Sequence, residues 1–127
     1  MRIIERKLKT AFEAGKELYI SNSMVKVENE IVSLYLFGHC IAMRNTRSNQ
    51  TCFTLAGWNT STTRSRLRNV LGIGVYNNKR VPHIGMRKLD SRAWYAVAPE
   101  FCEGFRTVTS DLEELITKPT AERENTL

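Results

Sequence analysis

The chain has few of the residues on which catalysis and metal binding usually depend. Its three cysteines are odd in number and lack C-x-x-C spacing, so we expect no disulfide scaffold and no zinc site. The two histidines, His39 and His83, are far apart in sequence and neither has a neighbouring carboxylate. A G-x-x-x-x-G-K-[ST] phosphate loop is absent. We therefore expect a binding protein that has no metal or cofactor and is not an enzyme.

Long hydrophobic runs are also missing. No apolar stretch approaches the roughly 20 residues that a membrane-spanning helix needs. The first ten residues, MRIIERKLKT, mix charges with apolar residues and lack the apolar core of a secretory signal. We expect a cytoplasmic protein without membrane contact, folded as a single domain over its 127 residues.

Negative charge is scarce in the middle of the chain. Residues 51–98 hold eight Lys or Arg against one acid, Asp90, whereas residues 99–127 hold three bases and seven acids. Most of the net charge of +6 therefore comes from the middle segment. Such a segment indicates a polyanionic or phosphate-bearing partner, and the common alternative is a solvated basic face without a function.

The hydrophobic periodicity predicts an α+β fold with an N-terminal helix, a basic central helix and a short C-terminal helix around an antiparallel sheet. The N-terminal helix is expected over about 3–19, where apolar residues recur at spacings of three and four. Its apolar stripe could pack on its own domain or on another subunit. Short strands at hairpin spacing indicate a meander, one face of which the helices cover, and are expected at residues 24–28, 31–36, 39–44 and 51–55.

The second half of the chain carries weaker signals. The central helix is expected over 61–71, with Gly72 ending it, and further strands are expected at 75–76 and 92–97. Residues 77–80 read either as a hairpin between those strands or as a loop. A capping box beginning at Ser110 predicts a short helix to about Thr117, and a frayed tail is expected over about 119–127.

The stretch GWNTSTTRSRLR, residues 57–68, places five hydroxyl groups and three arginines where the central helix begins. A helix start normally favours negative charge, and one hydroxyl is enough to cap it. The surplus suggests an anion supplied by a ligand, because free N–H groups, hydroxyls and guanidiniums together suit phosphate oxygens. The candidate phosphate ligands are Ser61, Thr62, Thr63, Arg64 and Arg68. The alternative is a solvated basic helix.

Aromatic residues flank this basic segment. Base stacking on aromatic rings beside arginines contributes about 1–3 kcal/mol per base. The candidate base or ribose contacts are Trp58, Asn59, Tyr76, Phe101 and Arg106. For Trp58 and Trp94 the alternative is ordinary core packing.

The succession of a short strand at 51–55, the Gly57-Trp58 step and the run from Asn59 to Leu67 resembles a group of small phage-encoded proteins that includes the anti-Thoeris sponge proteins. The matching motif covers about fifteen residues, with looser similarity from Ile31 to Val75. Proteins of this group capture the cyclic ADP-ribose-type signal of a bacterial TIR-domain defence enzyme, and some take up cyclic oligonucleotides of the kind made by cGAS-like enzymes.

The resemblance implies a phage anti-defence protein in the cytoplasm of the infected bacterial host, which sequesters signalling nucleotides without cleaving them. It also implies an α+β fold and a homo-oligomer, from a dimer up to a hexamer built of dimers, with pockets between subunits. A rival hypothesis is a small basic nucleic-acid-binding phage accessory protein, whose affinity would fall steeply with salt. A third is an inhibitor that binds a host protein through its surface.

Overall fold

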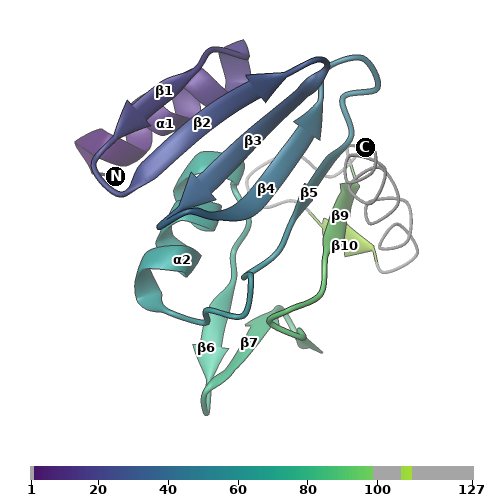
Figure 1. Cartoon of the computed structure of the whole chain (residues 1–127). Coiled ribbons are helices and arrows are strands. Elements are labelled where there is room, and N and C mark those ends of the chain that lie inside the picture. Colours follow the sequence, from purple (N-terminus) through teal and green to yellow (C-terminus); the bar gives the residue numbers. More distant parts are fainter. Residues whose placement is uncertain (1, 99–106, 110–127) are drawn as a thin grey trace.

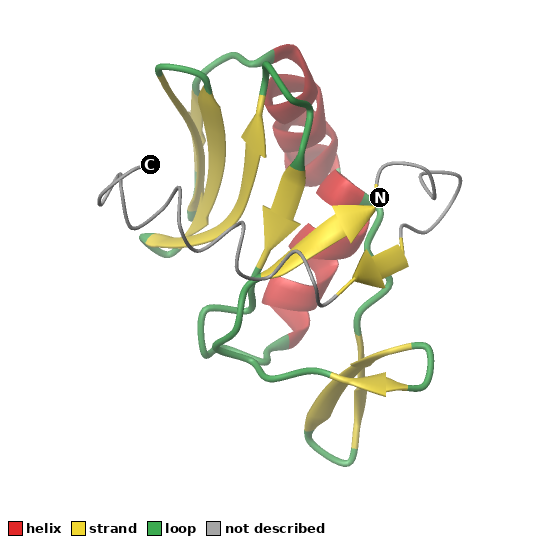
Figure 2. Ribbon diagram, turned by 90° about the vertical axis from the view of Figure 1, so that its right-hand side faces the viewer, coloured by secondary structure: helices red, strands yellow, loops and turns green. Residues whose placement is uncertain are grey.

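The computed structural model describes residues 2–98 and 107–109 and has the predicted α+β architecture. One large antiparallel sheet carries the helices on one of its faces, and a small second sheet projects from the end of the molecule near the central helix (Figures 1 and 2). The large sheet has the strand order β1-β2-β3-β4-β5-β9-β10. Its strands are β1 (Leu18–Ile20), β2 (Ser23–Glu28), β3 (Ile31–Leu36), β4 (His39–Asn45), β5 (Thr51–Phe53), β9 (Tyr95–Ala98) and β10 (Thr107–Thr109).

The predicted meander is confirmed in strands β2 to β5, which pair in sequence order. Side chains alternate between the two faces, and in β3 every second residue is buried. The register places Leu34 opposite Val25 and Ala42, all three on the face that the helices cover. The buried core therefore lies between the sheet and the helices, as the alternation predicts.

Helix α1 (Ile3–Ala14) is shorter than the predicted helix over 3–19. Gly15 adopts the left-handed conformation at φ 70° and its N–H bonds the carbonyl of Ala11, which ends the helix. The chain then turns back into β1, so Leu18 and Tyr19 pair with β2. The prediction ran too far because Gly15 also fitted the apolar spacing, and its role as a helix stop was missed.

The central helix has two parts, α2 (Ser61–Arg66) and the π-helical segment η1 (Leu67–Leu71). The predicted end is confirmed, since Gly72 is left-handed at φ 77°. Leu67, Val70 and Leu71 are buried, as predicted. The π-helical turn was not predicted, because apolar spacing over one turn does not distinguish α from π winding.

The small sheet consists of β6 (Tyr76–Asn78), β7 (Val81–Ile84) and β8 (Arg87–Lys88). The hairpin predicted at residues 77–80 between strands 75–76 and 92–97 is wrong in its second strand, because the turn at Lys79 and Arg80 joins β6 to β7, whereas β9 pairs with β5 and β10 in the large sheet. The first strand begins one residue after Val75. The strand predicted over 92–97 begins at Tyr95, and β7, β8 and β10 were not predicted. The predicted C-terminal helix and the tail lie outside the described residues.

Arg44 on β4 ties the sheet to the end of α1. Its Nη2 donates to the carbonyls of Phe12 at 2.6 Å and Glu13 at 3.1 Å, and its guanidinium lies 5.7 Å from the ring centre of Phe12. These carbonyls have no partner within the helix, so a basic side chain satisfies them.

No described helix is long and apolar enough to cross a membrane.

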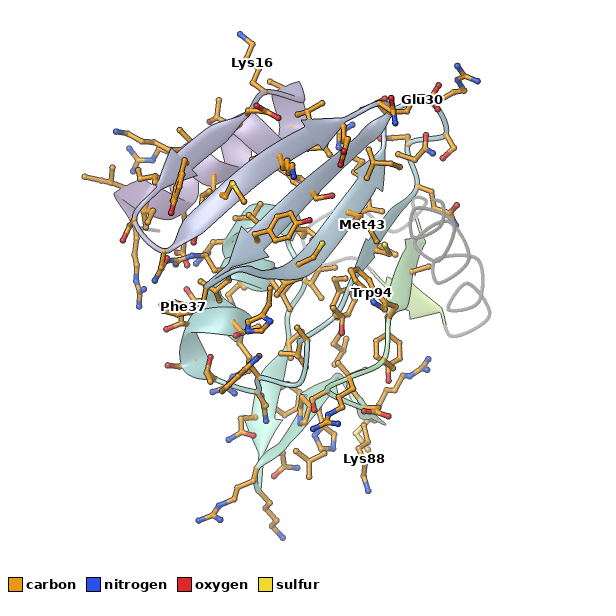
Figure 3. The ribbon with its side chains drawn as sticks, viewed as in Figure 1. Lys16, Glu30, Phe37, Met43, Lys88 and Trp94 are labelled. Carbon is orange, nitrogen blue, oxygen red and sulfur yellow. The ribbon has the colours of Figure 1, made fainter. Side chains whose placement is uncertain are left out.

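The second face of the sheet also carries apolar side chains. Met43 and Cys52 are opposite each other in the β4–β5 ladder, Ala96 is opposite Cys52, and Trp94 packs against this cluster. Figure 3 shows Met43 and Trp94 in front of the sheet ribbon, while α1 passes behind it. Among the described residues, the helices therefore cover one face of the sheet.

Candidate functional site

A cavity of about 370 Å³ lies where the β3–β4 turn meets the loop that leads into α2. Pockets for small ligands typically measure about 300–1,000 Å³, so this one is at the small end of that range. It is lined by apolar and aromatic side chains from the turn and the sheet, and by hydroxyl groups from the helix start: Leu36, Phe37, His39, Ile41, Leu55, Trp58, Thr60, Thr62 and Thr63.

The loop that presents Trp58 has an unusual backbone. Ala56 and Gly57 are both left-handed, at φ 55° and 83°, and the N–H of Trp58 bonds the carbonyl of Leu55 at 2.8 Å. The N–H of Gly57 bonds the carbonyl of Ser91 at 2.8 Å, which holds the loop against the chain before β9. This tight turn leaves the Trp58 side chain 54% exposed on the cavity wall, so core packing is not its role.

Trp58 forms an aromatic pair with His39. The two ring centres are 5.8 Å apart and the rings are tilted by 40°. Phe37, at the left-handed position of the β3–β4 turn, is 67% exposed and lines the same cavity. Large exposed aromatic rings around one hollow are a usual feature of ligand sites.

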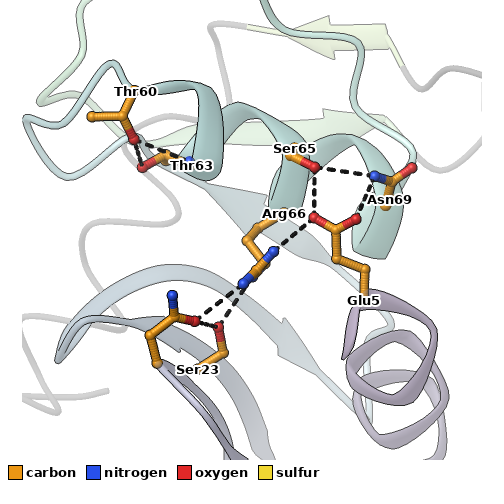
Figure 4. A network of polar contacts seen from close by, with 8 residues as sticks. Glu5, Ser23, Thr60, Thr63, Ser65, Arg66 and Asn69 are labelled. Atoms are coloured by element: carbon orange, nitrogen blue, oxygen red, sulfur yellow. Dashed lines mark hydrogen bonds and ion pairs between the residues drawn. The ribbon is translucent and has the colours of Figure 1, made fainter. Parts of the chain in front are cut away.

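The hydroxyl groups line the cavity at the start of α2. Thr60 is the N-cap, and its Oγ1 accepts from the N–H of Thr63 at 3.2 Å and lies 3.0 Å from the Thr63 hydroxyl (Figure 4). Thr62 also lines the cavity, and its hydroxyl makes no hydrogen bond within the described residues. The structure thus brings Trp58, Thr62 and Thr63 together, as the sequence predicts, with one hydroxyl used for capping.

Arg64 does not line the cavity. Its Nη1 donates to the backbone carbonyl of Asn59 at 3.1 Å and to Asn59 Oδ1 at 2.5 Å. Asn59 in turn donates through Nδ2 to Asn77 Oδ1 on β6 at 3.0 Å. The guanidinium therefore lies beside Asn59, which is flanked in the chain by the cavity residues Trp58 and Thr60.

The remaining predicted site residues are spread over the molecule. Ser61 is exposed at the first position of α2, and Arg68 is exposed in η1; neither lines the cavity. Tyr76 lies on β6, where its hydroxyl donates to the Gly85 carbonyl at 2.5 Å and its ring stacks on His83. Phe101 and Arg106 lie outside the described residues. The predicted residues therefore do not form one cluster.

The third arginine of the quoted stretch, Arg66, is buried, with 2% of its surface exposed. Its Nη1 forms an ion pair of 2.8 Å with Oε2 of Glu5, which is completely buried in the first turn of α1. Ser65 and Asn69 donate to the same carboxylate at 2.6 and 2.7 Å (Figure 4). Part of the negative charge that seemed to be missing at this helix is thus supplied by α1.

The Glu5 carboxyl is held in its ionised form by these contacts. Burial by itself raises its pKa, because it removes water from the charged group. The hydrogen bonds from Ser65, Arg66 and Asn69, together with the positive charge of Arg66, outweigh that effect. The net result is a pKa below the usual value of 4.5.

Two parts of the site were missed in the sequence. Phe37 and His39 line the cavity but are not among the predicted site residues. Arg92 is not among the predicted site residues either, yet its side chain passes over Gly57: a Cβ atom built on that glycine would lie 3.6 Å from Arg92 Nε. A cation therefore lies beside Gly57, the residue before Trp58 in the chain.

The side chains that line the cavity include no carboxylate and no thiol. No group of three or more His, Cys, Asp or Glu side chains among the described residues is arranged to hold a metal ion.

In comparisons with known proteins, a family model described as Kyanoviridae Gp96 protein matches residues 1–108. No curated protein and no solved structure matches the chain.

Proposed function

The chain belongs to the Kyanoviridae Gp96 family and is a phage protein, and we propose that it captures signalling nucleotides of the host's defence and sequesters them without cleaving them. The observation that carries this proposal is the cavity in which aromatic rings and threonine hydroxyls meet at the start of α2. The ligands that it would take are cyclic ADP-ribose isomers and cyclic oligonucleotides, since each combines a flat base with phosphate groups.

The base would stack in the aromatic part of the cavity. Trp58 is half-exposed there and already lies against His39, so a base has a preformed aromatic surface on which to stack. Stacking of this kind contributes about 1–3 kcal/mol per base. The apolar walls at Leu36, Ile41 and Leu55 would exclude water from the base edges.

The phosphate would lie at the start of α2. The hydroxyl of Thr62 is without a partner among the described residues and faces this space. Arg64 does not line the cavity, but it belongs to the same first turn of α2. Its Nη1 donates to Asn59, so Nε and Nη2 of the same guanidinium remain as donors to an anion. Arg92 lies over Gly57 and would supply a further positive charge at the loop that leads into α2.

Sequestration rather than turnover is supported by the chemistry of the lining. Cleavage of a phosphate or glycosidic bond needs a general base, a nucleophile or a metal. Among the lining residues His39 is the one side chain of a type that commonly serves as a general base, and its ring is paired with Trp58. Tight binding needs no such group.

The test is a capture-and-release assay. The protein is incubated separately with cyclic ADP-ribose isomers and cyclic oligonucleotides, washed and heat-denatured, and the supernatant is assayed for intact nucleotide. Recovery of unaltered nucleotide supports the proposal. Degraded products would instead show an enzyme, and no uptake of either class would contradict the proposal.

Two substitutions locate the ligand. Trp58→Ala is expected to weaken uptake at least about tenfold, the equivalent of one stacked base. Tyr76→Ala is the matched control, because Tyr76 is also an exposed aromatic but does not line the cavity. A loss of uptake in Tyr76→Ala with normal uptake in Trp58→Ala would show that the nucleotide binds outside this cavity.

A further inference from the structure

The small sheet formed by β6, β7 and β8 projects from the body of the molecule (Figures 1 and 2). We call these strands the ribbon, residues 76–88. Tyr76, Asn77, Asn78, Lys79 and Arg80 are all exposed, in one unbroken run through β6 and the turn after it. The ribbon lines no part of the cavity, and we infer that it is a separate surface that binds the phosphate backbone of duplex nucleic acid.

The charge of the ribbon is of one sign. It carries four cations, Lys79, Arg80, Arg87 and Lys88, and no acid. Lys79, Arg80 and Lys88 are exposed, and none of them forms an ion pair with a described carboxylate. In Figure 3 the Lys88 side chain points away from the ribbon into the surroundings. Such an acid-free group of cations has its natural partner in a polyanion.

The turn of the ribbon places cations where glycine or asparagine is preferred. Lys79 and Arg80 are both left-handed, at φ 52° and 68°, as a two-residue turn of type I′ requires. For a residue with a side chain this conformation costs roughly 1–2 kcal/mol. Two cations at the tip are therefore present in spite of the backbone preference, which is consistent with a role for their charge.

The ribbon is held firmly at its base. Asn59 donates to Asn77 Oδ1 at 3.0 Å, and the N–H of the buried Leu89 bonds the carbonyl of Pro82 at 2.8 Å. The Arg87 guanidinium lies 5.3 Å from the centre of the Tyr95 ring and anchors the last strand to the body. The tip and Lys88 are thus presented from a rigid support.

The shape and the exposed groups favour a nucleic acid over other polyanions. The major groove of duplex DNA admits two β-strands, and the β6–β7 hairpin with its cationic tip has this form, while β8 pairs along the other side of β7. Lysine and arginine side chains contact DNA phosphates. Asn77 and Asn78 add exposed amides, which can bond to phosphates or base edges. A lipid surface fits less well, because Met86 is the single large apolar side chain at the far turn.

The experiment measures binding to a fluorescent DNA duplex of about 20 base pairs by anisotropy, over salt concentrations from about 50 to 200 mM. Each phosphate contact contributes about −0.9 to the slope of log affinity against log salt. With Lys79, Arg80 and Lys88 in contact we expect a slope of about −2.7. The variant Lys79→Asn with Arg80→Gly should reduce that slope by about 1.8.

This variant is chosen because Asn-Gly suits a type I′ turn, so the melting temperature should not fall. The control is Lys7→Gln with Lys16→Gln, which removes the same amount of charge elsewhere. Lys7 is an exposed residue of α1, and Lys16 is the exposed residue that follows the C-cap of this helix. An equal loss of slope in the control would overturn the proposal, as would the absence of duplex binding at low salt. Binding to phosphatidylserine vesicles without binding to the duplex would also overturn it.

Nucleotide capture gives an independent readout. The ribbon variant should retain the uptake of cyclic nucleotides, because Lys79 and Arg80 do not line the cavity. Failure of the ribbon proposal would leave nucleotide capture unchanged, and failure of nucleotide capture would leave the salt slope unchanged.

Discussion

The three arginines at the central helix have three different environments. Arg66 is buried against Glu5, Arg64 is bonded to Asn59, and Arg68 is exposed one turn further along. Equal spacing in the sequence therefore does not mean equal roles. The reason is geometric, since residues two apart on a helix lie on different sides of it.

Glu5 is expected to be a main determinant of stability at the residue scale. In Glu5→Gln the amide removes the negative charge and leaves Arg66 buried without a counter-charge. Breaking one partner of a buried ion pair costs about 3–5 kcal/mol. Urea unfolding should show this loss, and the control Glu13→Gln, which removes an exposed pair with Lys9, should change the free energy of unfolding by less than about 1 kcal/mol. A normal midpoint in Glu5→Gln would contradict the assigned role of the network.

The lowered pKa of Glu5 predicts the direction of a pH effect. Because the pKa is lower in the folded chain, the unfolded chain binds the proton first as the pH falls below about 4.5. The stabilisation by the network is therefore fully present above that pH and is lost as the pH falls through the folded pKa. Urea midpoints measured from pH 7 to 3 should fall more steeply in the wild type than in Glu5→Gln. Parallel curves would show that Glu5 does not carry the effect.

Gly57 allows a separate test of the Trp58 loop. At φ 83° a side chain is strained whatever the surrounding space, and its Cβ would also lie against Arg92. Gly57→Ala should therefore destabilise the fold by about 1–2 kcal/mol and reduce nucleotide uptake by shifting Trp58. Gly85→Ala is the control, since Gly85 is left-handed too but lies on the ribbon. Gly85→Ala should lose similar stability and keep nucleotide uptake. Equal uptake in both variants would show that nucleotide binding does not depend on the conformation of the Trp58 loop.

At the scale of elements, the contacts of α1 decide how the helices cover the sheet. Its first turn supplies Glu5 to the central helix, and its last carbonyls accept from Arg44 of β4. Its middle packs Leu8 and Phe12 into the core. The helix is therefore attached at both ends by charged groups and in the middle by apolar ones.

Arg44→Leu tests the attachment at the end of α1. It leaves two helix carbonyls without a donor, which costs about 1–3 kcal/mol for a charged hydrogen bond. Arg47→Leu is the matched control, because Arg47 is 80% exposed and its ion pair with Glu30 should contribute less than about 1 kcal/mol. Thermal melts of both variants compare the two losses. Equal shifts in melting temperature would mean that the Arg44 contacts contribute no more than a surface pair.

At the scale of the whole molecule, the β1 edge of the large sheet, which pairs with no further strand within the described residues, bears on self-association. β1 is the first strand in the sheet order, and its Tyr19 is 79% exposed. An exposed apolar edge strand is a site at which another strand can pair. The homo-oligomer stays a prediction, and we propose this edge as the contact between two copies.

Light scattering tests that contact. The wild type should have at least twice the mass of the 14.6 kDa chain. Tyr19→Lys should shift the mass toward that of a single chain, because charge on an edge strand opposes pairing. Lys26→Tyr changes a solvent-exposed position in the neighbouring strand and should leave the mass unchanged. A wild-type protein with the mass of one chain would contradict self-association.

Local signals in the sequence determined much of the fold. The alternating strands from β2 to β5 and the helix stop at Gly72 follow from short-range pattern and turn chemistry. Whereas the sequence left Trp58 open between a ligand contact and core packing, the hydroxyls at the start of α2 are the part of the candidate site that was predicted. These features need only neighbouring residues, which is why they could be read from the chain.

Tertiary structure alone decided which of these residues meet. Glu5 lies 61 positions from Arg66, and the cavity joins Phe37 and His39 of one turn to Trp58 of a later loop. Such distant pairings depend on how the helices pack on the sheet and on how the strands register. A single sequence contains the residues for these contacts but not the packing geometry that brings them within a few ångströms of each other.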